Sequence, residues 1–187
     1  MSTRPLFIMA AVTCAGLCIA AGPASKPKQP APVEPTRPMD DEQLNTLIKR
    51  LDPKADIQNN VRSLTIEGHR LVVVSDANAD RMRIMTPLVP VEGLEEGMMK
   101  RMLQANFDAV LDARYAIAQN RVWSAFIHPL SPLTAKQFYS GLAQVVVAAE
   151  TFGSTFTSGA LVFGGGDTNS LHKDLYERIV RQGKMKI

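Results

Sequence analysis

The sequence predicts an α+β fold with the order helix, three strands, helix, two strands, helix, in which the helices pack on an antiparallel twisted sheet. Three observations carry this prediction: helical spacing of apolar residues over 93–107, alternation over 113–127, and a helix with clear start and stop signals over 134–153. With 45% hydrophobic residues, the chain can build a core of ordinary size.

The first helix is expected to start near Asp40, where the carboxylate of Asp40 or of Asp41 can accept hydrogen bonds from the free amides of the first turn; Gln43 lies at capping-box distance from Asp40. Pro53 ends it. Its apolar stripe consists of Leu44, Leu47, Ile48 and Leu51.

Three strands are predicted over residues 61–67, 71–74 and 81–85. A tight turn at Gly68-His69 separates the first two. The unbroken run from Leu71 to Val74 is typical of a central strand that is covered on both faces. Pro87 and Pro90 are expected to end the third strand and lead into the next helix.

That next helix, over 93–107, places five apolar residues on one predicted buried stripe: Leu94, Met98, Met102, Leu103 and Phe107. A hairpin follows, with a turn at Gln119-Asn120 and an aromatic second strand over 122–127. Because side chains alternate along a strand, Trp123 and Phe126 point to opposite faces, so one is expected in the core and the other can be exposed.

The last long helix starts at a capping box of Thr134 and Gln137 and ends at Gly153. Its valines suggest burial on more than one side. Beyond it, Ala160–Phe163 can add an edge strand or pack as an arm. A short basic amphipathic helix over 171–180 can dock on its own domain, dock on a second protomer or fray.

Four segments are therefore predicted: a signal peptide (1–24), a Pro-rich linker (25–39), the α+β domain (40–163), and a Gly-rich connector with the C-terminal helix (164–187). The first segment has a basic start, an apolar run and small residues near a cleavage position between Ala20 and Ser25. Export to the periplasm or the extracellular space is expected, without a stable membrane span after cleavage; an uncleaved anchor is the alternative. Both cysteines lie in this segment, so the mature chain has neither a disulfide nor a cysteine nucleophile.

No catalytic residue, metal ligand set or cofactor site is predicted. Residues 40–162 carry 12 basic and 14 acidic side chains, which disfavours nucleic-acid binding. Asp76–Asp80 matches only the first ligand positions of a calcium loop and is interpreted as a turn stabilised by its own side chains. Gly164–Asp167 lacks the spacing and the lysine of a phosphate loop.

The segment MLQANFDAVLDARYAIAQNRVWSAFIHPL (102–130), together with the element order, resembles the type III secretion chaperone-like fold that is shared with the YbjN-type families. The resemblance spans about 40–163. It implies a homodimer that binds protein segments and has no enzymatic activity. Secretion chaperones are cytosolic, so the expected export signal sets this chain apart.

The first functional hypothesis is an exported, non-enzymatic module that binds another polypeptide or a second copy of itself through a sheet edge and the aromatic hairpin. The candidate binding residues are Met82, Ile84, Trp123 and Phe126. One alternative is a small-molecule-binding protein or enzyme using Ser154–Asp167 and His128. The other is a structural component of the cell envelope.

Overall fold

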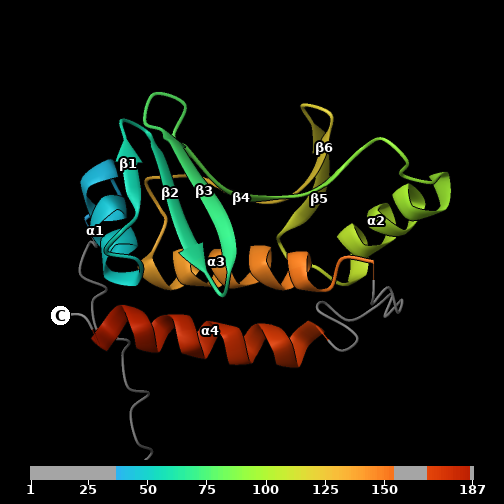
Figure 1. Ribbon diagram of the computed structural model, residues 1–187. Helices are drawn as coiled ribbons and strands as arrows, with labels where there is room; N and C mark the ends of the chain where they lie inside the picture. Colours follow the sequence, from blue (N-terminus) through green and yellow to red (C-terminus); the bar gives the residue numbers. More distant parts are fainter. Residues whose placement is uncertain (1–36, 154–167, 186–187) are drawn as a thin grey trace, which may run out of the picture. The chain divides into compact units, whose positions relative to one another are not determined.

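The computed structural model describes residues 37–153 and 168–185, and it confirms the α+β fold. A six-stranded antiparallel sheet has the strand order β1-β2-β3-β4-β6-β5 (Figure 1). The strands are β1 (Asp56–Gln58), β2 (Val61–Ile66), β3 (His69–Asp76), β4 (Arg81–Pro90), β5 (Arg114–Ala118) and β6 (Arg121–His128). Only the short β1 has no counterpart in the sequence prediction.

The described helices are α1 (Asp41–Leu51), α2 (Glu96–Asp108), α3 (Ala135–Glu150) and α4 (Thr168–Met185). Their predicted end signals are present. The Asp40 carboxylate accepts a hydrogen bond from the amide of Gln43, and Thr134 with Gln137 forms the reciprocal capping box. Gly153, with a φ of 79°, adopts the left-handed conformation expected after a helix.

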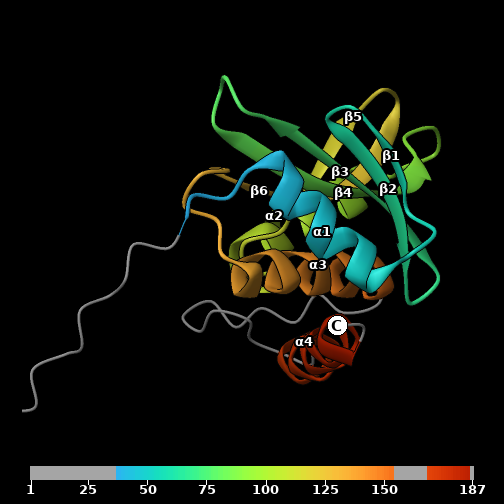
Figure 2. The same ribbon diagram turned by 90° about the vertical axis from the view of Figure 1, so that its left-hand side faces the viewer.

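Helices cover one face of the sheet. α1 and α3 lie against this face, and α4 packs on the far side of α3 (Figures 1 and 2). Leu175 and Ile179 of α4 are buried, and the Gln182 side chain donates to the Leu51 carbonyl of α1 at 2.8 Å. The C-terminal helix therefore docks on its own domain, and α3 is buried from two sides, as its valines suggested.

The predicted two-sided burial of β3 is wrong. Leu71 and Val73 are buried beneath the helices, whereas Val72 and Val74 on the opposite face are only partly buried. A β-branched run reports a strand inside a sheet, but the pattern does not reveal whether a second layer covers its other face.

Of the two prolines predicted to end this strand, Pro87 lies within β4 and Pro90 is its last residue, so the strand is longer than the predicted 81–85. Beyond Met85, β4 no longer pairs with β3 and pairs with β6 alone, with a register shift between Pro87 and Pro90. A proline is tolerated there because one side of the strand needs no ladder hydrogen bond. The β2–β3 turn lies one residue earlier than predicted, at Glu67-Gly68, where both residues have positive φ.

Helix α2 buries only part of the predicted stripe: Met102 is in the core, and Leu94 and Met98 pack against it. Met102 and Ala105 are buried, whereas Leu103 and Phe107 are 70% and 73% exposed. Successive residues lie about 100° apart around a helix, so Leu103 cannot share the narrow face of Met102. The helix extends away from the sheet near β5 (Figure 1). The exposed Leu103 and Phe107 lie one turn apart on it and belong to a second apolar stripe.

Candidate functional site

The sheet face turned away from α1 and α3 is left uncovered by the described helices (Figures 1 and 2). Residues opposite one another in neighbouring strands share this face and lie about 5 Å apart. One row across β3, β4, β6 and β5 consists of Val72, Met85, Ala125 and Arg114. The next row consists of Val74, Arg83 and Ile127. The uncovered face is thus apolar with arginines set into it.

Two adjoining hollows of about 560 and 320 Å³ lie along this face. The first spans β3, β4 and β6, and the second spans β4, β5 and β6. Arg83, Met85 and Ile127 line both hollows, so we treat them as one surface. This sheet groove is defined by Val74, Arg83, Met85, Trp123, Ala125 and Ile127.

Two large side chains, Ile127 and Trp123, provide much of the apolar contact surface of the sheet groove. Ile127 is 56% exposed although it lies in the middle of a sheet. Trp123 is partly buried, and its indole N–H donates to the Ala118 carbonyl at 2.9 Å, which satisfies the only polar group of the ring. A ring with its polar atom already bonded offers a wide apolar contact surface to a partner.

The predicted binding residues fall on both sides of the sheet. Met82, Ile84 and Phe126 are at most 4% exposed and belong to the core, so they are not accessible to a partner in this fold. Trp123 points into the sheet groove, on the opposite face from Phe126, as its position in the strand required.

Sequence reasoning missed Arg83, Met85 and Ile127. The signal was available, since Ile127 lies four residues from Trp123 and therefore on the same strand face.

The sheet edge at β5 is partly closed. The Asn106 side chain of α2 accepts from the Tyr115 amide at 2.7 Å and donates to the Tyr115 carbonyl at 3.1 Å, as a neighbouring strand would. The Tyr115 hydroxyl in turn donates to the Ala148 carbonyl at 2.6 Å, and burial raises the pKa of Tyr115 to about 12, so it stays a neutral donor. At this edge, backbone pairing with a partner is therefore restricted to the region of Ile117, which is 49% exposed.

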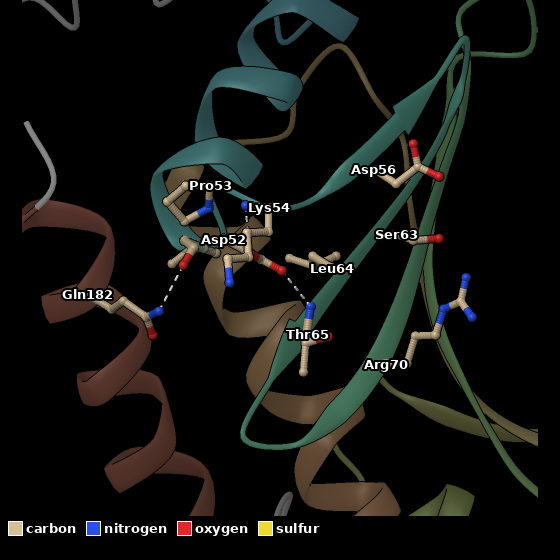
Figure 3. A pocket seen from close by; sticks show the side chains of 10 residues that line it. Asp52, Pro53, Lys54, Asp56, Ser63, Leu64, Thr65, Arg70 and Gln182 are labelled. Atoms are coloured by element: carbon tan, nitrogen blue, oxygen red, sulfur yellow. Dashed lines mark hydrogen bonds between the residues drawn. The ribbon is translucent and has the colours of Figure 1, made fainter.

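A third hollow of about 560 Å³ lies between the end of α1, β2 and α4 (Figure 3). Its Asp52 carboxylate accepts hydrogen bonds from the backbone amides of Lys54 and Thr65 at 2.9 and 3.0 Å. This carboxylate is thereby used to hold the α1–β1 connection against β2.

The catalytic and metal-site readings gain no support from the described residues. Within residues 37–153 and 168–185, no three His, Cys, Asp or Glu side chains converge as a metal site, and no helix is long and apolar enough to cross a bilayer. The Asp76 carboxylate accepts from the amides of Asn78 and Ala79, which is the self-bonded turn expected from sequence. Hydrogen bonds from the Ser131 amide and hydroxyl lower the pKa of Asp80.

The His128 side chain contacts neighbouring residues of its own chain. Its Nδ1 lies 2.7 Å from the Pro129 carbonyl, and its ring stacks on Phe126. The other residues of the small-molecule hypothesis, Ser154–Asp167, lie outside the described residues, as does Ala160–Phe163. That hypothesis and the envelope-component hypothesis therefore stay predictions.

No family model matches this chain, and no curated protein matches it either. Solved structures with similar folds include the ExsC–ExsE complex (17% identity, TM-score 0.49, covering 63% of this chain and 96% of the other) and the HopA1–SchA chaperone–effector complex (11%, 0.48, 60% and 94%). A third is the Yersinia pestis type III secretion chaperone SycH with a fragment of YscM2 (12%, 0.44, 57% and 97%). At identities and TM-scores this low, the function of this chain has to be inferred from its own surface.

Proposed function

We propose that this protein is a non-enzymatic module that binds another polypeptide in its sheet groove. The observation that carries the proposal is an uncovered sheet face on which Trp123, Met85 and Ile127 form one apolar surface. A contiguous exposed apolar patch with polar groups around it is typical of a protein-interaction site. The hollows are shallow and open, which suits an extended peptide better than an enclosed small molecule.

We further propose that the protein is a homodimer that associates through α2. Met99, Leu103 and Phe107 recur every four residues and form a second apolar stripe on this helix, and the last two are strongly exposed. A second copy of the same stripe is the simplest partner, because a two-fold interface brings like surfaces together. This surface is separate from the sheet groove, so dimerisation leaves the groove free.

The test is retention of a partner by the immobilised full chain from an extract of its source cell, with identification by mass spectrometry. Ile127→Asp is expected to weaken retention by about tenfold or more, because it places a charge in the apolar surface. Ile127 is more than half exposed, so folding should persist, as circular dichroism would establish.

Leu171→Asp is the matched control, since Leu171 is 43% exposed but lies on α4, behind α3 (Figure 1). It should retain the partner as the wild type does. Retention that survives Ile127→Asp, or no protein retained by the wild type, would count against polypeptide binding in the groove.

A further inference from the structure

We infer that the occupant of the sheet groove is an extended segment whose groove-facing side chains are in turn acidic and apolar. The inference rests on the proposed polypeptide-binding function and specifies the chemistry of the partner. Two features of the same face support it: an unusual charge distribution and the position of one arginine among apolar side chains.

The strands that carry the groove are biased toward one kind of charge. β3, β4, β5 and β6 together contain no lysine and no glutamate, and a single aspartate, Asp76. Their basic residues are Arg70, Arg81, Arg83, Arg114 and Arg121, and strand alternation places all of them on the uncovered face. Residues 40–162 as a whole have more acidic than basic residues. The uncovered face is therefore a positive region on a domain whose acidic and basic residues nearly balance, once α4 is counted with it.

Not all five arginines are equally available. Arg81 faces Asp76 across the β3–β4 ladder, and the Arg114 guanidinium donates to the carbonyls of Leu111 and Ala113. Arg83 is exposed and forms no ion pair with any carboxylate in the described part of the chain. It also lines both hollows of the groove, whereas Arg70 and Arg121 line neither.

The surroundings of Arg83 define the pattern of the partner. Val74 and Ile127 are its direct neighbours on β3 and β6, and Met85 follows it on the same face of β4. A carboxylate bound to Arg83 would thus have apolar contacts on its sides, which reduce its exposure to water and strengthen the charge-assisted hydrogen bonds. An extended segment presents every second side chain to one surface, with about 7 Å between them. Acidic and apolar side chains in turn along that row match this surface.

A nucleic acid fits the groove less well. Phosphate recognition requires a continuous track of cations along a backbone, whereas the centre of this groove has one open arginine among Val74, Met85 and Ile127. Arginine, with its planar fork of donors, is also the cation that binds a single carboxylate through two hydrogen bonds.

The experiment measures fluorescence anisotropy of labelled peptides of about ten residues, long enough to cross the groove, with the full chain. The first peptide has glutamate and then leucine or valine in turn at every second position, with serine between them, so that both kinds of side chain can face the groove. The second has lysine in place of glutamate, and the third has serine in place of the apolar residues. The first should bind tightest, with an affinity that falls as salt rises. Arg83→Glu should weaken it about tenfold or more, and Arg83→Gln by less.

Arg101→Glu is the matched control. It makes the same change of charge at an exposed position on α2, away from the groove, and should leave peptide binding unchanged. Circular dichroism checks that each variant is folded.

The inference is overturned if the lysine peptide or a single-stranded oligonucleotide binds as well as the glutamate peptide, or if Arg83→Glu has no effect. Retention of the natural partner by the same variants shows whether only the acidic specificity fails or polypeptide binding in the groove fails as well. A partner lost with Ile127→Asp but kept with Arg83→Glu would leave polypeptide binding in place and remove the acidic specificity. The peptides can be poor substitutes for the natural partner. If none of them binds, loss of the natural partner from the Arg83→Glu variant would support the inference. If the wild type retains no protein at all, both polypeptide binding in the groove and its acidic specificity are refuted.

Discussion

Gly141 sets how closely α3 approaches the sheet. A Cβ atom at this position would lie 2.7 Å from Cδ1 of Phe126 and 3.1 Å from Cδ1 of Ile84, closer than carbon atoms pack without strain. The absence of a side chain therefore lets the helix backbone rest on the inner face of β4 and β6. This contact seats Phe126 in the core and leaves Trp123 on the other face.

Gly141→Ala is expected to destabilise the domain by about 1–3 kcal/mol through overpacking against Phe126, which exceeds the gain of up to about 1 kcal/mol in helix propensity. Thermal unfolding of both proteins, followed by circular dichroism, measures the difference. Gly97→Ala on α2 is the control, because nothing lies within 4 Å of the added methyl group. It should leave the melting temperature unchanged or raise it. A Gly141→Ala protein as stable as the wild type would mean that Phe126 moves aside freely.

The same residue type has opposite roles on two strands of the sheet. Arg62 on β2 is fully buried and donates to Asn45 and Asp41 of α1, whereas Arg83 on β4 is exposed. Burial would raise the pKa of Asp41, but hydrogen bonds from Ser75 and Arg62 outweigh it, and the pKa is lowered. The carboxylate thus stays charged and compensates the buried guanidinium.

At the scale of elements, α2 is the described helix with the largest exposed apolar side chains, Leu103 and Phe107. It buries Met102 and Ala105, and Asn106 holds the β5 edge, but its outward stripe has no cover among the described residues. An amphipathic helix owes its stability mainly to the surface on which its apolar face packs. Because α2 has two apolar faces, we expect each of them to pack on a surface: one on its own domain and the other on a partner.

The double variant Leu103→Glu with Phe107→Glu is expected to convert the proposed dimer into a monomer, because it places like charges opposite each other across a two-fold interface. Light scattering on the purified full chain measures the mass. The variant should still bind partner in its sheet groove. Arg101→Glu again serves as control and should stay dimeric. A wild type that is already monomeric at micromolar concentration would refute this association.

At the scale of the molecule, the described domain has two unlike sides. α3 lies between the sheet and α4, so the helical side is built up in layers while the opposite sheet face is open (Figure 2). The α1–α4 side is held by specific contacts such as the bond from Gln182 to Leu51. The open face carries the arginines and the exposed apolar side chains.

We also propose that the chain is exported, on the basis of its basic start, apolar run and small residues before Ser25. Expression in its source cell, followed by fractionation and N-terminal sequencing, should recover a protein outside the cytoplasm that begins between Ala21 and Ser25. A chain that is recovered uncleaved and only from the cytoplasm would contradict export.

The sequence by itself determined the order of the elements, because helix caps, turns and strand alternation are local. Asp40, the Thr134–Gln137 box and the Gln119-Asn120 turn all fold as predicted, since each bonds to residues a few positions away. Strand alternation also required Trp123 and Phe126 to face opposite ways.

Only the tertiary structure decided which of those two faces became the surface. That choice depends on where α3 packs, and thus on contacts such as that of Gly141 with Phe126, about fifteen residues apart in the chain. The same applies to Val72, Val74 and Leu103, which are apolar at positions that suit a core but lie where no described element covers them. A local pattern reports that a side chain is apolar and which neighbours share its face; whether that face is buried depends on parts of the chain far away in sequence.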